Sequence, residues 1–78
     1  MTTENEISRC IRKAVDVYIH DLEGEKPLPL HEMVLRSAEI PLIEIVLKHA
    51  EGNQTFAAEL LGINRNTLRN KIKQYRIK

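Results

Sequence analysis

The feature that most constrains the fold of this chain of 78 residues is its single cysteine, Cys10. It excludes an intramolecular disulfide and a cysteine-rich zinc module, two of the devices that stabilise domains of this size. Below roughly 70–80 residues one hydrophobic core seldom contributes more than ~3–5 kcal/mol, so association with a second copy is expected. We expect the thiol itself to be buried and structural rather than nucleophilic.

Apolar residues recur at steps of three and four along most of the chain, which is the period of amphipathic helices. The sequence has no alternating strand pattern, so the predicted fold class is all-α. Thr3 and Glu6 have the spacing of a capping box for the first helix, and Gly24 is expected to end it. Pro41 is expected to bend the second helix rather than end it. The four predicted helices cover about residues 7–22, 30–50, 54–61 and 65–75.

The second predicted helix is apolar over more of its circumference than one neighbour requires. In a chain this short, we expect the additional face to meet another copy as a dimer interface. A groove for a different partner helix is the alternative. The residues of this face are Leu42, Ile43, Ile45, Val46 and Leu47.

Charge is distributed unevenly, although the chain as a whole carries +1. Residues 1–51 hold six Lys or Arg against ten Asp or Glu, a net charge of −4, whereas residues 52–78 hold six against one, a net charge of +5. A basic end joined to an acidic front is typical of a nucleic-acid-binding protein whose scaffold is kept off the phosphates. A solvated basic helix without a partner is the alternative that charge alone leaves open.

Residues 54–73 have the pattern of a helix-turn-helix. Ala58 is small where two helices must cross closely, and Gly62 can adopt the positive φ of the turn. Ile63 is expected to fill the angle between the helices, and Leu68 and Ile72 to attach the second helix to the first. An ordinary helical hairpin with a charged outer face is the alternative.

The second helix of this motif carries Asn, Arg and Thr at its start and Arg and Lys further along. In a helix-turn-helix the first residues of that helix lie at base edges in the major groove. Arg pairs with guanine, Asn with adenine, and Thr with a base or the thymine methyl group. Asn53 and Asn64 are also good N-caps, and for Asn64 the sequence favours capping and base reading equally.

These residues resemble the Fis family of bacterial nucleoid-associated DNA-binding proteins. The similarity is strongest from Ile40 to Tyr75 and fades through the first predicted helix. It rests on the strings Gly-Asn-Gln-Thr at 52–55, Ala-Ala at 57–58, Gly-Ile-Asn-Arg at 62–65 and Thr-Leu-Arg at 67–69.

The resemblance implies an all-α homodimer in which the first two helices of each subunit form an intertwined core. It implies one Fis-type domain over residues 1–78, with dimerisation helices in 1–51 and a helix-turn-helix DNA-binding region in 52–78. It also implies binding and bending of double-stranded DNA, in transcription regulation and nucleoid organisation in the cytoplasm. By position, the base-reading residues would be Asn64, Arg65 and Thr67, and the backbone-contacting residues Asn53, Thr55, Arg69, Lys71 and Lys73.

Five positions depart from the family pattern, and four of them replace a basic residue, which reduces the expected number of phosphate contacts. Weaker and less salt-sensitive DNA binding is therefore predicted. Only about six residues precede the first predicted helix, so the N-terminal arm by which Fis proteins activate DNA invertases is not expected. The departures are Glu51 and Phe56 where Arg is frequent, Asn70 and Gln74 where Lys is frequent, and Asn66 where Gly is frequent.

Other residues of chemical interest do not group into a site. His20, His31 and His49 include no pair at the i, i+4 spacing of a helical metal site, so surface positions are predicted. The sequence has no phosphate loop, nucleophile–base pair or cofactor motif, so neither an enzyme nor a bound cofactor is predicted. Its apolar runs stay below the ~18 residues of a membrane span. A helical protein–protein adaptor that never contacts DNA is the alternative function.

Overall fold

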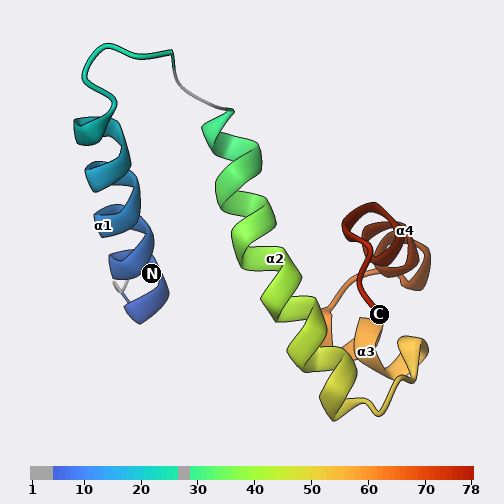
Figure 1. Cartoon of the computed structure of the whole chain (residues 1–78). Coiled ribbons are helices and arrows are strands. Elements are labelled where there is room, and N and C mark those ends of the chain that lie inside the picture. The colour runs from blue at the N-terminus through green and yellow to red at the C-terminus, as the bar shows by residue number, and fades with distance from the viewer. Residues whose placement is uncertain (1–4, 27–28) are drawn as a thin grey trace. The chain divides into compact units, whose positions relative to one another are not determined.

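The computed structural model describes residues 5–26 and 29–78, and these residues form four helices (Figure 1). The helices are α1 (Glu6–Asp21), α2 (Leu30–His49), α3 (Gln54–Leu61) and α4 (Arg65–Tyr75). No strand occurs in these ranges, so the predicted all-α class is confirmed. Within them, no helix is both long and apolar enough to cross a bilayer. The chain divides into two compact units, Met1–Val34 and Leu35–Lys78, with the division inside α2.

The cap of α1 differs from the sequence prediction. The Asn5 Oδ1 accepts a hydrogen bond from the Ser8 N–H at 2.8 Å, which satisfies one of the free donors of the first turn. Asn5 therefore occupies the N-cap position predicted for Thr3, which lies outside the described residues. After the helix ends at Asp21, Gly24 adopts the predicted left-handed conformation, with φ of +85°.

No residue of α1 is buried. The half-buried residues Val15, Tyr18 and Leu22 follow the predicted stripe, whereas Ile7 at its start is exposed. The predicted burial of Cys10 is wrong: this residue lies beside the stripe rather than on it, and it is exposed. By itself, α1 supplies no closed core.

α2 continues through Pro41 without ending, as the apolar pattern predicts. Buried Ile43 anchors the helix just after the proline, which removes one backbone donor. The chain turns after α2 with left-handed φ angles at Glu51 (+54°) and Gly52 (+81°). The Gly52 N–H closes this turn by donating to the Leu47 carbonyl at 3.0 Å.

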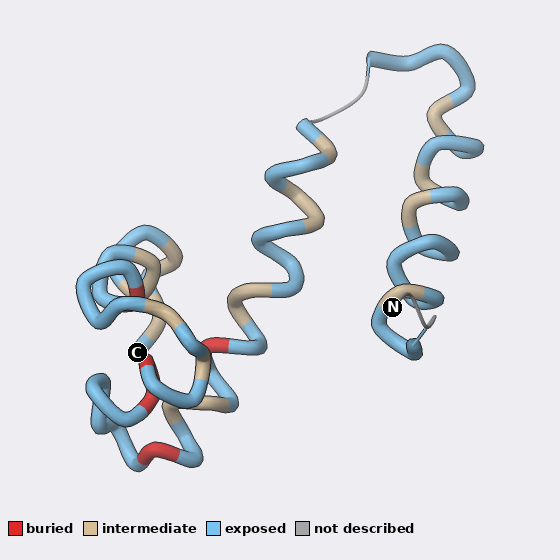
Figure 2. Tube along the Cα trace, turned by 180° about the vertical axis from the view of Figure 1, so that it is seen from behind, coloured by how far each residue is buried: buried red, intermediate tan, exposed pale blue. Residues whose placement is uncertain are grey.

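The hydrophobic core of the second unit lies where the second half of α2 meets α3 and α4 (Figure 2). Half-buried Val46 and Leu47 of α2 pack against it. The core thus attaches the last two helices to α2 by apolar contacts from all three elements. Its buried members are Ile43, Ala50, Ala57, Ala58 and Leu68.

The position of Ile43 differs from the predicted dimer interface. Only 2% of this residue is exposed, because it shares a face of α2 with Ala50, seven residues later, and lies in the same core. Leu42 and Ile45 are instead 49% and 47% exposed. The proposed boundary after Glu51 also cuts through the second compact unit, since the end of α2 forms part of the core beneath α3 and α4.

Candidate nucleic-acid interface

α3 and α4 pack against each other around a turn at Gly62. Gly62 is the C-cap of α3 with φ +74° and ψ +27°, a left-handed conformation that glycine adopts without steric cost. Ala58 is buried, Leu68 is fully buried, and Ile63 and Ile72 pack against the same core. The roles predicted for these residues in a helix-turn-helix are consistent with these positions.

Two asparagines begin the helices of this motif. The Asn53 Oδ1 accepts from the Phe56 N–H at 3.1 Å, and the Asn64 Oδ1 accepts from the Asn66 N–H at 2.7 Å. Both are the predicted N-caps. Capping uses only the side-chain oxygen of Asn64, so its amide nitrogen stays available as a donor to a base.

The outer face of α4 is polar and exposed. Arg65 and Thr67 lie exposed in its first turn, with Arg69 and Lys73 exposed further along. The Arg65 Nη1 donates to the Thr55 Oγ1 of α3 at 3.5 Å, a long and weak hydrogen bond. A predicted base-reading residue and a predicted backbone-contacting residue therefore lie side by side.

A basic groove of about 750 Å³ runs along α4. Arg69, Lys73 and Arg76 line it at steps of four and three, so they share one side of the α4 region. Gln54, at the first turn of α3, also lines it. The lining residues include no acidic side chain, so the groove favours a polyanion such as nucleic acid.

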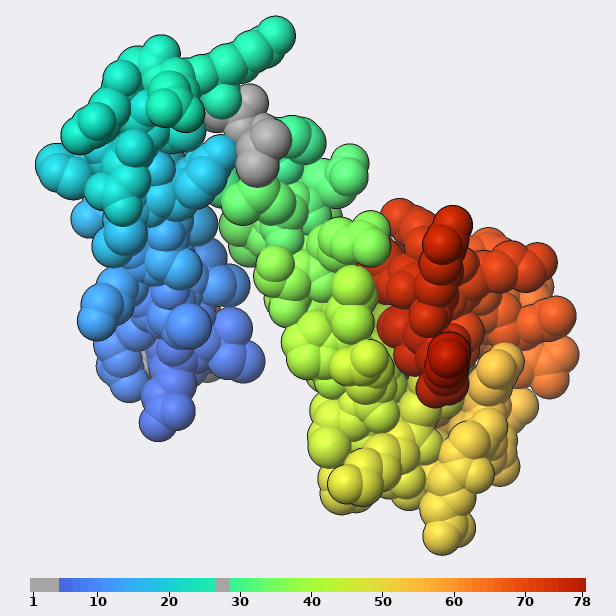
Figure 3. All heavy atoms as spheres, viewed as in Figure 1, coloured from blue at the N-terminus to red at the C-terminus, as the bar shows by residue number. Residues whose placement is uncertain are grey.

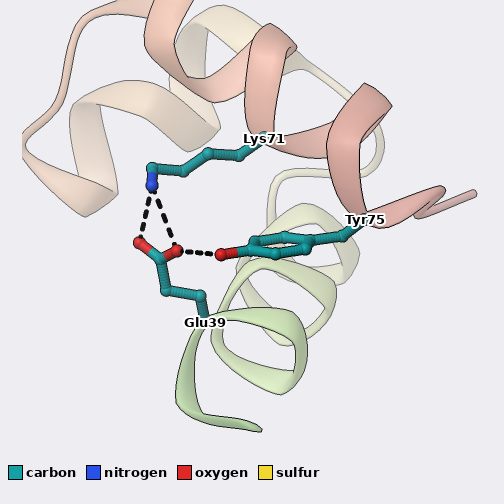
Figure 4. Close-up of polar contacts among 3 residues, drawn as sticks. All are labelled: Glu39, Lys71 and Tyr75. Atoms are coloured by element: carbon teal, nitrogen blue, oxygen red, sulfur yellow. Dashed lines mark hydrogen bonds and ion pairs between the residues drawn. The ribbon is translucent and has the colours of Figure 1, made fainter. Parts of the chain in front are cut away.

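Lys71 does not join this exposed basic face. Its Nζ lies 3.0 Å from Oε1 and 2.9 Å from Oε2 of Glu39, on α2 (Figure 4). Tyr75 also donates its hydroxyl hydrogen to the Glu39 Oε1. The Arg36 guanidinium carbon lies 5.5 Å from the centroid of the Tyr75 ring, within cation–π range. These four residues are called the α2–α4 clamp.

The same contacts shift the pKa values of three clamp residues. Hydrogen bonds from Tyr75 and then from Lys71 lower the pKa of the Glu39 carboxyl from its usual value of 4.5. The hydrogen bond to Glu39 raises the pKa values of both Lys71 and Tyr75. At neutral pH the clamp therefore contains a carboxylate, an ammonium and a neutral phenol.

Sequence reasoning missed Glu39 and Arg36. One signal was present: Tyr75 follows Leu68 and Ile72 at helical spacing, and a tyrosine hydroxyl on that inner side of the helix needs a hydrogen-bond partner. Figure 3 shows α4 and the end of the chain lying directly against α2 and α3, which brings Tyr75 within reach of Glu39.

The three histidines are the remaining candidates. His20, His31 and His49 are exposed, as predicted. In the described part of the chain, no group of three or more His, Cys, Asp or Glu is placed to hold a metal ion.

Similarity to known proteins covers the whole helix-turn-helix and its core. The family model "Bacterial regulatory protein, Fis family" matches residues 34–75, more than half of the chain. A protein of Ralstonia nicotianae described as a Fis-like DNA-binding protein is 51% identical over 73 residues, covering 94% of this chain and 95% of that relative. The DNA-binding protein Fis of Psychromonas ingrahamii is 45% identical over 73 residues, covering 94% and 74%. That of Glaesserella parasuis is 48% identical over 65 residues, covering 83% and 66%.

Proposed function

The chain belongs to the Fis family of bacterial DNA-binding regulatory proteins, and from this premise we propose that it binds double-stranded DNA as a homodimer and bends it. Its role would be in transcription regulation and nucleoid organisation. One observation carries the proposal: an exposed, basic α4 on a helix-turn-helix core, inside the segment that matches the family model. A groove lined by basic and no acidic side chains suits a polyanion, and the alternative function, a protein–protein adaptor, does not require one.

In this proposal the first turn of α4 reads bases. Arg65 would donate two hydrogen bonds to a guanine, and Thr67 would contact the next base or a thymine methyl group. The long hydrogen bond from Arg65 to Thr55 is weak enough to be exchanged for DNA at little cost. Asn64 would cap α4 and present its amide nitrogen to the groove at the same time.

A second set of residues would contact the phosphate backbone. Arg69 and Lys73 lie in the basic groove, and Asn53 and Thr55 lie at the start of α3. Such contacts position the protein on the duplex but carry little sequence information. Lys71 was also predicted for this set, and its ammonium pairs with Glu39 in the clamp.

Substitution of Arg65 and of Lys73 tests the two roles against each other. Arg65→Ala is expected to cost about 1–3 kcal/mol on a good site and to flatten the preference for guanine at one position per half-site. Lys73→Ala is the matched control: it should weaken binding to all sequences alike and lower the log–log salt slope by about one unit per half-site. Binding to randomised duplexes, followed at several salt concentrations, measures both effects. Sequence preference that survives Arg65→Ala would overturn the assignment of this residue.

A further inference from the structure

The clamp joins the recognition helix to α2 beside their shared apolar core. Glu39 lies one turn before buried Ile43 on α2, and Lys71 lies one turn after buried Leu68 on α4. The side chains of Glu39 and Lys71 are only 27% and 29% exposed. The polar and apolar contacts between α2 and α4 are therefore adjacent, and together they restrict how α4 lies on α2.

Lys71 differs in this respect from the other basic residues of its helix. Among the described residues, Arg69 and Lys73 form no ion pair, and both line the groove. The ammonium of Lys71 is held between both oxygens of one carboxylate, and Figure 4 shows Lys71 and Tyr75 both directed from α4 toward Glu39. The charge of a cation held in this way is already compensated by a carboxylate, so it attracts a phosphate less than an unpaired lysine does.

Tyr75 provides a second contact between α4 and Glu39. Lys71 and Tyr75 are four residues apart on α4 and converge on one carboxylate, while Arg36, three residues before Glu39, covers the ring of Tyr75. Two side chains of α2 thus hold two side chains of α4. Contacts at two positions one turn apart on α4 resist rotation of the helix better than a contact at one position.

We propose that Glu39 is a positioning residue for DNA recognition, which fixes α4 on α2 through Lys71 and Tyr75 and keeps Lys71 off the phosphates. This inference rests on the proposed DNA binding. Under this proposal Arg69 and Lys73 contact DNA, whereas Lys71 aligns α4. Lys71→Glu should weaken DNA binding whether Lys71 contacts a phosphate or pairs with Glu39. Only the ion pair can be restored by also reversing the charge of Glu39.

Charge reversal of both partners therefore distinguishes the two roles. The variants are Lys71→Glu, Glu39→Lys and the two combined, and dissociation constants on one duplex are compared by fluorescence anisotropy. Lys71→Glu alone is expected to weaken binding about tenfold, and the double variant, which has the native net charge, to return to within about threefold of the native protein. Lys73→Glu, alone and combined with Glu39→Lys, is the matched control, for which no recovery is expected.

A milder pair of variants covers the case in which Lys71→Glu fails to fold. Lys71→Met keeps the apolar stem and removes the charge, and should leave the salt slope of binding unchanged, whereas Lys73→Met should lower it by about one unit per half-site. Equal salt slopes for these two variants, or a double reversal that binds as weakly as Lys71→Glu, would overturn the inference. Failure of the native protein to bind any duplex would instead overturn the proposed function.

Discussion

At the scale of single residues, Glu39 brings Lys71 and Tyr75 together on one carboxylate. Its Oε1 accepts from both Lys71 and Tyr75, and the pKa of its carboxyl is lowered because these donors favour the ionised form. The unfolded chain thus binds a proton more readily than the folded one. Stability from this group is present in full above the usual value of 4.5 and is lost as the pH falls through the lower folded pKa.

The Glu39→Gln variant should therefore be less stable than the native protein at neutral pH, and the difference should shrink in acid. We expect a loss of about 1 kcal/mol in the free energy of unfolding at pH 7, which shrinks as the pH falls below 4.5. Urea unfolding at pH 7 and pH 3, at one protein concentration, measures this. Raised pKa values at Lys71 and Tyr75 act only on the alkaline side, so they leave the acid result unaffected. Glu44→Gln, exposed on the same helix, is the control, and a loss for Glu39→Gln that is as large at pH 3 as at pH 7 would contradict this account.

Residues whose partners lie nearby in the sequence were predictable, and residues with distant partners were not. Asn53, Asn64 and Gly62 act within three or four residues, so spacing alone identified the caps and the turn. Glu39 and Lys71 are 32 residues apart, and their pairing depends on how α4 lies on α2. Local pattern holds no information on that arrangement, so the pairing of Lys71 with Glu39 could not be predicted from the sequence.

At the scale of elements, α2 serves two surfaces. One face places Ile43 and Ala50 in the core beneath α3 and α4, and another leaves Leu42 and Ile45 about half exposed. The excess of apolar residues was visible in the sequence, but not its division between these faces. A helical period allots residues to sides of the helix, yet it does not state which side meets the same chain.

The exposed face of α2 is expected to be the dimer interface, and Ile45→Glu tests it. The native chain should sediment at low micromolar concentration as twice 9.0 kDa, because an apolar face of this kind is costly to leave in water. A carboxylate at position 45 would be buried there without a partner and should shift the protein to monomer. Leu60→Glu, at an exposed apolar residue of α3, is the control that should remain dimeric. A folded native monomer at that concentration would contradict the interface.

At the scale of the whole molecule, a dimer built on this face would hold its two reading helices near the symmetry axis. Leu42 and Ile45 lie within one helical turn of Ile43, which is buried in the core that carries α4. Straight B-DNA presents successive major grooves roughly 34–36 Å apart. Two recognition helices held closer than this period can both enter the duplex only if the DNA narrows its minor groove between the half-sites and curves toward the protein.

The resulting expectation is DNA bending with a preference for an A/T-rich centre that no residue touches. Narrowing the minor groove is easiest in A/T-rich sequence, and smooth bending of such a site costs on the order of 1–6 kcal/mol, so affinity should follow the sequence of the centre. The flanking duplex would then come near Lys73 and Arg76 in the basic groove. Circular-permutation gel mobility on duplexes that differ only in their central base pairs measures both the bend and the preference. Lys73→Ala should reduce the bend while keeping the A/T preference, because it removes a contact to the flanks and none to the centre. Equal affinity for A/T and G/C centres, with mobility independent of the position of the site, would rule out this mechanism.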